Sequence, residues 1–528
     1  MAKFLALIVT LACVVGSVQC CRPFWEIIWP PLLPPPPPPL LPPPPPPSLP
    51  SPSPNNKDGS FSPPPLPYDP HNPPISPSPS SYDNLGPTSQ PPLSPSQPPL
   101  SPSRPPLPSS HVKPSDAPSS HDSGNKTKQL PQALAPSHVS DRTLLNVLHY
   151  GAKGNGRDDD SQAFKDAWDD ACRSSSSSGI FVPAGPKYML LPMSLSGPCN
   201  ANITVQIDGE LVAPEEPSEW GCSVCHTWIE FEQVDGLTIQ GSGSFNGQGA
   251  GWWRKSFCDD VGDIKDCHKK PTSLNIVKAH NLSIRDLTFK DSPQMHIVIG
   301  HSRHVHIDNL VIRAAGNSPN TDGIHIQNCE HVQVSDSDIG TGDDCISISN
   351  GSSDVNVKGV LCGPGHGVSI GSLGKNGAED KVENVHVKDV HFRGSTNGAR
   401  IKTWQGGKGY AKNIIFEDIT CDRVRNPIII TQFYCDHEIC RTQASAVQIS
   451  NVTFSNVKGS SYTEKAIELE CSESHPCTDI ILKDIDLRWT KRQRETQSTC
   501  SNVQGRRNGN ISPSVPCLAF DDKLGYNH

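Results

Sequence analysis

Three acidic side chains and a histidine recur at a regular spacing in the middle of the chain. Asp322, Asp344 and His366 are each 22 residues apart, and Asp343 directly precedes Asp344. Each of the three regularly spaced positions lies two residues before a short segment in which apolar and polar residues alternate. If these segments stack as neighbouring strands, the side chains lie roughly 4.8 Å apart from one repeat to the next. Carboxyl and imidazole groups clustered in this way are suited to general acid–base catalysis.

A pair of cations continues the pattern one repeat later. Ala399 and Ile401 are the apolar positions of the next alternating segment, so Arg400 and Lys402 point to the opposite face. That is also the face predicted for the acidic cluster. Arg can bind a carboxylate through two parallel hydrogen bonds, and Lys adds a second positive charge. These residues therefore indicate a site that binds an anionic sugar beside the bond to be cleaved.

The acidic residues have two other interpretations. Asp side chains often hydrogen-bond the backbone of turns, which would explain Asp322 taken alone. Stacked like charges are destabilising without a function, however, so the set as a whole favours catalysis. Acidic clusters also bind Ca²⁺, but a histidine and two cations on the same surface disfavour a divalent cation. We therefore expect no metal and no cofactor.

A repeated phrase surrounds these residues and predicts the fold. It consists of two apolar residues separated by one residue, then a short polar pair, then a third apolar residue. Copies occur at 282–287, 305–310, 332–337, 355–360, 385–390, 414–419, 447–452 and 480–485, at spacings of 23 to 33 residues. A second set of short alternating segments, of which Ile324-His-Ile is one, lies between them. Each copy has the alternation of a strand that buries one face.

Strands that recur at this interval are typical of the coils of a solenoid. The antiparallel hairpins of a β-sandwich would instead recur every 8–12 residues or so. The sequence therefore predicts an all-β fold, a right-handed parallel β-helix over residues 141–528. Residues 159–171 carry Ala163, Phe164, Ala167 and Trp168 at helical spacing. We expect this helix to cap the first coil, whose strand edges would otherwise be unpaired.

Proline divides the chain into two regions. Of its 55 prolines, 41 lie between Pro23 and Pro136. Proline fixes φ and has no N–H to donate, so residues 21–140 are predicted to be a disordered, extended segment. This segment is either a linker or a wall-associated tract, since it resembles the extensin-like tracts of secreted wall proteins. We therefore predict three parts: 1–20, 21–140 and 141–528.

The first 20 residues resemble a secretory signal. Lys3 is followed by an apolar run from Phe4 to Val15, which is too short to span a bilayer. We therefore expect a secreted protein without a membrane anchor, and six N-x-S/T sequons are compatible with that prediction. The net charge of −9 excludes a global basic field, so nucleic acid is not an expected partner.

The cysteines agree with an oxidising compartment. Sixteen of them lie in 141–528, and an even number in a secreted domain predicts disulfides. Short separations suggest four local pairs. These are Cys258–Cys267, Cys435–Cys440, Cys471–Cys477 and Cys500–Cys517. Cys222 and Cys225 could form a zinc or redox motif, which is disfavoured because no second ligand pair accompanies them.

Four motifs together resemble those of glycoside hydrolase family 28, the polygalacturonases. They are Asn320-Thr-Asp-Gly323, Gly342-Asp-Asp-Cys345, Gly365-His-Gly367 and Arg400-Ile-Lys402. The resemblance covers about residues 145–525, and the longer phrases around the last two motifs look plant-like. It implies a parallel β-helix that hydrolyses α-1,4 linkages between galacturonic acid units of pectin, with inversion at the anomeric carbon.

The resemblance also implies a role for each site residue. Asp343 would be the general acid, and Asp322 and Asp344 would position and deprotonate the water. His366 would help to set the state of the acid, and Arg400 and Lys402 would bind the galacturonate carboxylate. Tyr434 resembles a substrate-contacting tyrosine of the family; the alternative is a plain tyrosine at a strand end. Mutual repulsion should raise the pKa of one carboxyl of the cluster.

The expected partner is pectin, with the Pro-rich segment as a tether to the cell-wall matrix, and the expected state is a monomer. Three alternatives differ in function. A rhamnogalacturonan hydrolase would share the fold without needing Arg400 and Lys402. A pectin lyase would need Ca²⁺ and a basic proton acceptor. A non-catalytic wall protein would bind pectin without an intact set of acids.

Overall fold

The computed structural model describes residues 143–221, 226–254, 270–436, 440–491 and 494–521. Every described residue lies within the unit Lys126–His528. The predicted signal and Pro-rich segments lie outside the described residues. So do Cys222, Cys225 and the predicted Cys258–Cys267 pair. A domain boundary near residue 140 therefore stays a prediction.

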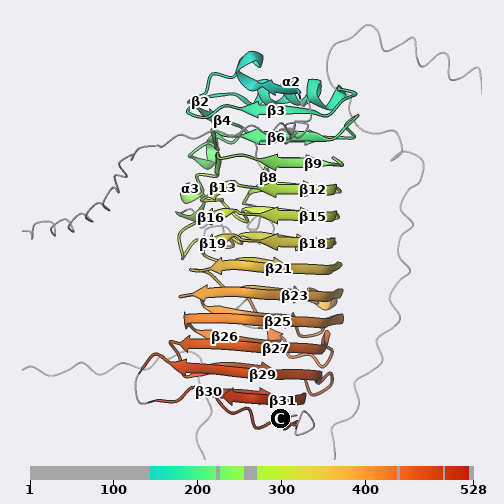
Figure 1. The fold of residues 1–528 in the computed structure, drawn as a ribbon, viewed down its shortest axis with the longest axis vertical. Helices are drawn as coiled ribbons and strands as arrows, with labels where there is room; N and C mark the ends of the chain where they lie inside the picture. The colour runs from blue at the N-terminus through green and yellow to red at the C-terminus, as the bar shows by residue number, and fades with distance from the viewer. Residues whose placement is uncertain (1–142, 222–225, 255–269, 437–439, 492–493, 522–528) are drawn as a thin grey trace, which may run out of the picture. The chain divides into compact units, whose positions relative to one another are not determined.

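Two parallel sheets form the described part of the chain (Figure 1), and each strand pairs with the equivalent strand of the next coil. We call one of them the site sheet. Its strands are β5 (Met193–Ser196), β8 (Thr227–Glu232), β11 (Thr272–Val277), β14 (Ile297–Gly300), β17 (Ile324–Gln327), β20 (Ile346–Ile348), β22 (Val368–Leu373), β24 (Asn397–Trp404), β26 (Asn426–Tyr434), β28 (Lys465–Glu470) and β30 (Gln497–Ser501).

The second sheet, here the long sheet, starts as two short strands per coil that later merge into one long strand. The short strands are β1 (Thr143–Asn146), β2 (Asn155–Asp159), β3 (Ser178–Val182), β4 (Lys187–Met189), β6 (Ile203–Ile207), β7 (Glu210–Val212), β9 (Leu237–Gln240), β10 (Ser244–Asn246), β12 (His280–Arg285), β13 (Thr288–Lys290), β15 (Arg303–Asp308), β16 (Val311–Arg313), β18 (Glu330–Ser335) and β19 (Asp338–Gly340). The merged strands are β21 (Ser352–Cys362), β23 (Glu379–Arg393), β25 (Lys408–Val424), β27 (Gln448–Ser461), β29 (Cys477–Trp489) and β31 (Val503–Ser512), followed by the short β32 (Ala519–Phe520).

The predicted right-handed parallel β-helix is confirmed. Inward side chains of the site sheet stack in register and are fully buried. One such column is Ile326, Ile348, Ile370, Ile401 and Ile430. Buried apolar surface of this kind, roughly 25 cal/mol per Å², is the main favourable contribution to folding.

The capping helix is also confirmed. Helix α2 (Ser161–Arg173) lies at the end of the stack in Figure 1 and buries Ala163, Phe164, Ala167 and Trp168 against the first coils. The remaining helical segments are short: η2 (Val147–Tyr150), η3 (Pro217–Glu219), α3 (Ala250–Arg254) and η4 (Lys375–Gly377).

The polar pair of the repeated phrase has a backbone explanation. Its second residue adopts positive φ in the left-handed region, as at Asp286 (61°), Asn309 (51°) and Asp389 (53°). Asn and Asp tolerate this conformation better than other non-glycine residues. The residue bends the strand, so the phrase marks a corner of the coil.

One predicted copy of the phrase is wrong in register. The copy was placed at 447–452, but Val452 is the residue that pairs with Ile414, so the true copy is 452–457. Residues 447–457 contain apolar residues at overlapping two-residue intervals, and the longer connection before them shifts the coil. The sequence offers two starting points for the strand, and only pairing with β25 distinguishes them.

Three of the four predicted local disulfides are confirmed: Cys435–Cys440, Cys471–Cys477 and Cys500–Cys517. Two further bonds, Cys172–Cys199 and Cys345–Cys362, were not predicted. The expectation that the even set is fully paired is wrong. Cys329 and Cys421 are free and buried, and burial raises the pKa values of their thiols to about 11 and about 12. They therefore act as small apolar core residues.

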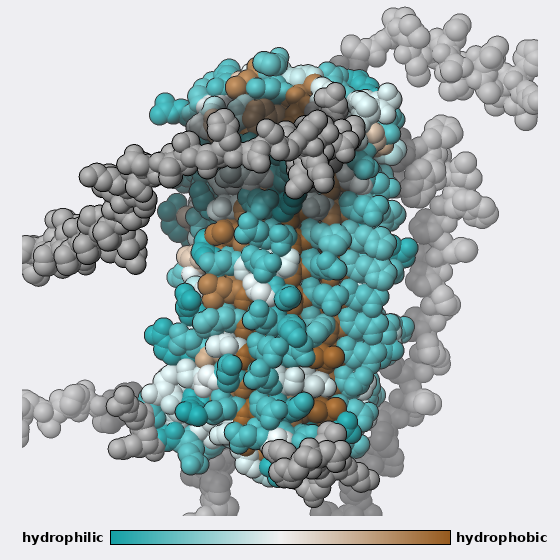
Figure 2. All heavy atoms as spheres, in the orientation of Figure 1, coloured by the Kyte–Doolittle hydropathy of each residue, from teal (hydrophilic) through white to brown (hydrophobic). Residues whose placement is uncertain are grey.

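The face of the described unit seen in Figure 2 is banded along its length. Teal bands mark stacked polar positions and brown bands mark stacked apolar ones, because equivalent positions of successive coils lie above one another. Among the described helices none has the length and apolar character needed to cross a membrane.

Another left-handed position is the residue directly before the repeated phrase, where side-chain amides of successive coils form a ladder. Asn413 (φ 57°) donates to Asn384 and accepts from Asn451. We expect Asn413→Ala to lower the free energy of unfolding by about 1–2 kcal/mol, because alanine is strained in this conformation. Asn413→Gly should cost less, since glycine is not strained there. Denaturant unfolding of both variants measures the difference, and an alanine variant as stable as the wild type would contradict it.

Candidate active site

The predicted acid–base residues lie on three successive turns that lead from the long sheet into the site sheet. Asp322 precedes β17, Asp343 and Asp344 precede β20, and His366 precedes β22. The following strands pair in register, Ile324 with Ile346 and Ile346 with Val368. The equal spacing in the sequence therefore becomes a stack of turns, as predicted.

Glycines allow these turns to approach closely. A Cβ atom at Gly342 would lie 2.0 Å from the backbone oxygen of Ser318. Gly367 has φ of 89°, and a Cβ atom there would lie 2.3 Å from the backbone oxygen of Gly398. Any side chain at either position would push the turns apart, so both glycines set the separation of the site residues.

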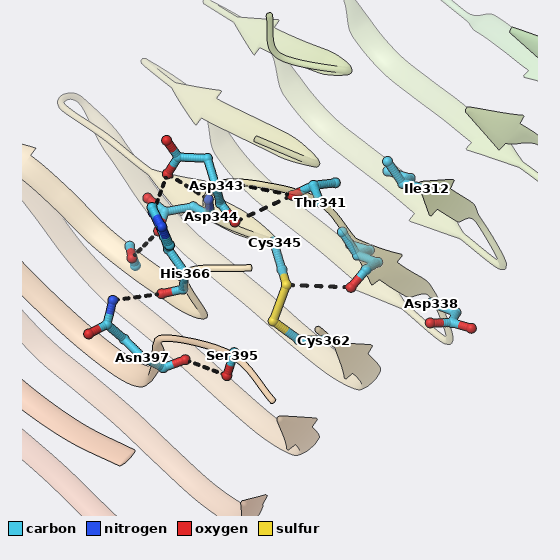
Figure 3. The surroundings of a disulfide bond; sticks show 12 residues. Ile312, Asp338, Thr341, Asp343, Asp344, Cys345, Cys362, His366, Ser395 and Asn397 are labelled. Atoms are coloured by element: carbon cyan, nitrogen blue, oxygen red, sulfur yellow. Dashed lines mark hydrogen bonds and ion pairs between the residues drawn. A yellow bond between two sulfur atoms is a disulfide. The ribbon is translucent and has the colours of Figure 1, made fainter. Parts of the chain in front are cut away.

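A disulfide ties the second turn to the third. Cys345 follows Asp344 directly, and Cys362 ends β21 just before the His366 turn. Figure 3 shows the Cys345–Cys362 bond beside the contact between Asp343 and His366. The covalent link therefore limits the relative motion of the two turns that carry those side chains.

Asp344 is a buried, charge-paired carboxylate. It is 1% exposed, and its oxygens lie 2.5 Å from Arg400 and 2.8 Å from Lys402. Ser369 donates a third hydrogen bond, at 2.7 Å. Burial acts to raise the pKa of Asp344, but the Arg400 and Lys402 charges outweigh it and lower the pKa to about 2. Asp344 is therefore ionised at every pH at which a secreted protein works.

Asp322 lies in the opposite electrostatic situation. It is 6% exposed and accepts a hydrogen bond of 2.7 Å from Ser347. Burial, and then the charges of Asp343 and Asp344, raise the pKa of Asp322 to about 8. The expectation that repulsion raises the pKa of one carboxyl is met at Asp322, where burial is the larger cause.

Asp343 is the more accessible carboxyl, with a side chain that is 18% exposed. Its Oδ1 atom lies 2.9 Å from Nδ1 of His366 and also accepts the backbone N–H of Asp344. The other oxygen has no hydrogen bond within the described residues. Asp343 is thus oriented from one side and open on the other, as a group that reaches a ligand must be.

The cluster fits acid–base chemistry better than a metal centre. Possible ligand atoms of Asp343, Asp344 and His366 lie within 4.8 Å of one another, as a divalent cation would need. Both oxygens of Asp344 already accept hydrogen bonds from Arg400 and Lys402. These two positive charges would repel a dication placed beside them.

The cationic pair lies outside the apolar core, as predicted, but is nearly covered. The side chains of Arg400 and Lys402 are 11% and 9% exposed. Tyr434 lies next to them at the end of β26, with its ring centroid 5.2 Å from Nζ of Lys402 and 5.2 Å from the Trp404 ring. The structure thus brings all seven predicted residues to one region, while their roles stay predictions.

Several polar residues beneath the cluster were missed by the sequence reasoning. Ser347 and Ser369 bind the two buried aspartates, and His325 lies 2.7 Å from Ser347. His296 lies below, with Nδ1 3.1 Å from the backbone oxygen of Asp322. The signal for the first three was present, since they occupy the middle positions of the same alternating triplets that locate Arg400. His296 has no such signal.

Comparison with known proteins gives a consistent result. The profile of glycosyl hydrolases family 28 matches residues 172–512. Polygalacturonase-2 of Solanum lycopersicum is 42% identical over 388 residues, covering 73% of this chain and 84% of the relative. A polygalacturonase of Persea americana is 44% identical over 366 residues, covering 69% and 78%. The exopolygalacturonase of Thermotoga maritima shares the fold, with a TM-score of 0.57 at 21% identity over 71% of this chain and 93% of that one.

The raised pKa of Asp322 predicts how stability depends on pH. The folded protein keeps this proton up to about pH 8, whereas the unfolded chain releases it near pH 4. The contribution is fully present below pH 4 and is lost as pH rises toward 8. We expect the free energy of unfolding to fall between pH 5 and 8 by up to about 1.4 kcal/mol per pH unit from this group. In Asp322→Asn the slope should flatten.

Unfolding in denaturant at several pH values measures these slopes. Asp389→Asn is the matched control, because Asp389 is exposed at a corner where asparagine is equally tolerated. Parallel slopes for the wild type and Asp322→Asn would show that Asp322 does not hold the proton.

Proposed function

This chain belongs to glycosyl hydrolases family 28, and from that premise we propose that it is a polygalacturonase. The reaction is hydrolysis of α-1,4 linkages between galacturonic acid units of pectin, with inversion. The observation that supports it most is the contact of the acidic cluster, through Asp344, with Arg400 and Lys402 two coils further along the stack. Acids supply the proton transfers of glycoside hydrolysis, and the cations match a substrate that carries a carboxylate on every unit.

Inverting hydrolysis needs two carboxyl groups in different protonation states. We assign Asp343 as the general acid that protonates the leaving oxygen, because it is the accessible carboxyl beside His366. Asp322, on the turn before β17, and Asp344, which follows Asp343 directly, position and activate the water. At mildly acidic pH the cluster retains a proton, which lies on Asp322 when no substrate is bound. In the reactive form that proton lies on Asp343.

The substrate carboxylate is the proposed ligand of Arg400 and Lys402. Asp344 and Ser369 use two of the five N–H donors of the Arg400 guanidinium, and Asp344 uses one of the three of the Lys402 ammonium. The remaining donors can bind an anion without breaking the ion pairs. Tyr434, next to Lys402, is proposed to contact the same sugar unit.

We further propose that the protein is secreted, acts as a monomer in the cell wall and needs no cofactor. The apolar run at 4–15, the Pro-rich segment and the disulfides support this location. In this proposal the Pro-rich segment holds the enzyme in the wall matrix that contains its substrate. Sizing of the products formed from polygalacturonate tests the activity, because saturated oligogalacturonates or galacturonate support hydrolysis and unsaturated ones would show a lyase.

Removal of the proposed general acid should abolish most of the activity. We expect Asp343→Asn to lower kcat on polygalacturonate by about 10²- to 10⁴-fold, because an amide cannot protonate the leaving oxygen. Reducing-sugar release measures the rate, and Asp389→Asn controls for the same chemical change on the surface. Unchanged reducing-sugar release from the Asp343 variant would show that the acid is misassigned.

The charge of Arg400 should matter most for a charged substrate. We expect Arg400→Gln to raise KM more on polygalacturonate than on highly methyl-esterified pectin, since the ester removes the anion that Arg400 binds. The ratio of the two KM changes separates the loss of binding to the substrate carboxylate from the loss of activity on both substrates that follows from disturbing Asp344. Arg285→Gln on the exposed face of β12 is the control. Equal changes on both substrates would contradict the assigned role.

A further inference from the structure

The two buried aspartates are held by matching serines. Ser347 on β20 donates to Asp322 and Ser369 on β22 donates to Asp344, each at 2.7 Å. The serines are register partners on neighbouring strands, 2% and 0% exposed. Each aspartate precedes its serine by 25 residues, so the same local arrangement occurs twice, one coil apart.

The two arrangements differ in the basic group behind the serine. Nε of Arg400 donates to the Ser369 hydroxyl at 2.8 Å. A guanidinium has donors and no acceptor, so the hydroxyl hydrogen of Ser369 can only point at Asp344. A fixed donor favours the ionised carboxylate, in agreement with the lowered pKa of Asp344.

Behind Ser347 the basic group is His325, with Nδ1 2.7 Å from the hydroxyl oxygen. Burial lowers the pKa of His325 to about 4, so the imidazole is neutral in the working range. A neutral imidazole nitrogen can either donate or accept, depending on the tautomer. The hydroxyl of Ser347 can therefore donate to an ionised Asp322, or accept from a protonated Asp322 and donate to His325.

We propose that His325, acting through Ser347, makes Asp322 the carboxyl that takes the proton from the attacking water, whereas Arg400, acting through Ser369, keeps Asp344 ionised. His325 is a positioning residue, because it reaches the reaction only through Ser347. The inference rests on the proposed hydrolase function and divides the roles of the two aspartates within it.

The proposed step conserves protons. The water oxygen bonds to the anomeric carbon, and its proton passes to Asp322. The glycosidic bond breaks, and the leaving oxygen takes the proton of Asp343. Protonated Asp322 then donates to Ser347, and Ser347 donates to Nδ1 of His325, whose ring proton is now on Nε2. His325 is partly exposed, so the change of tautomer can proceed by exchange with water.

Other charged groups face this chain of hydrogen bonds. Asp343, Asp344 and Lys402 act on Asp322, and Asp344 and Lys402 also act on His325. His296 contacts the backbone oxygen of Asp322 and is held neutral by burial, which lowers its pKa to about 4. Asp343, Asp344, Lys402 and His296 are unchanged in the variants below. A difference in the measured pH between those variants therefore arises from the hydrogen bond between Ser347 and His325.

The test compares the pH at which the acidic cluster loses its last proton. Ser347→Ala removes a donor to ionised Asp322 and should raise this pH. His325→Leu leaves the hydroxyl hydrogen of Ser347 without an acceptor when Asp322 is protonated, and should lower it. Each shift should be roughly 0.5–1 pH unit. His325→Asn can still donate or accept and should stay near the wild type, and the double variant should match Ser347→Ala.

Two measurements give this pH. The first is the pH at which kcat on polygalacturonate declines on the alkaline side, and the second is the midpoint of the change in unfolding free energy with pH. When Asp322→Asn is combined with each of these variants, the shifts in the stability midpoint should disappear. His306→Leu, on the exposed face of β15, is the matched control. Shifts of the same sign for Ser347→Ala and His325→Leu, or no shifts, would overturn the inference. A wild type that does not cleave polygalacturonate would refute the proposed function, while the stability midpoints would still test the role of His325.

Discussion

Parallel pairing of each coil with the next, in register, is the constraint on which the site depends. It converts equal distances along the chain into vertical stacks, so Asp322, Asp344 and His366 meet although each is 22 residues from the next. The same pairing brings Arg400 beneath Asp344 from two coils away. Because sheet hydrogen bonds fix the separation of coils at roughly 4.8 Å, the site residues inherit their spacing from the backbone. Few site-specific contacts are needed to place them.

The features of the structure that depend on the repeat could be predicted from the sequence. The β-helix, the capping helix and the proximity of the seven candidate site residues follow from alternation, spacing and motif resemblance, because a stack of coils leaves little freedom once the register is known. Where the register was ambiguous, prediction failed, as at 447–452, since two apolar alternations overlap and only pairing with β25 selects one. The even number of cysteines did not predict that Cys329 and Cys421 are free, because parity says nothing about which thiols lie close together.

The hydrogen-bonding layer under the site was beyond the sequence reasoning for a different reason. Ser347 and His325 were visible as residues that point away from the core. Their function depends on which aspartate each serine reaches, and that depends on turn geometry. Gly342 and Gly367 set this geometry by permitting backbone contacts that no other residue allows. Spacing predicts which residues share a stack, whereas the direction of each hydrogen bond depends on distances that only the folded turns define.

Charge balance explains why so many ionisable groups can share a largely buried site. One proton on Asp322 leaves two of the three carboxyl groups to match the two cations, Arg400 and Lys402, so that these five side chains carry no net formal charge. Ionising Asp322 as well would leave an uncompensated buried charge, which is costly and agrees with its raised pKa. In the proposed reaction one carboxyl releases a proton as another takes one, so the cluster remains neutral before and after the step. The proton moves between the turns without any change in the net charge buried between the coils.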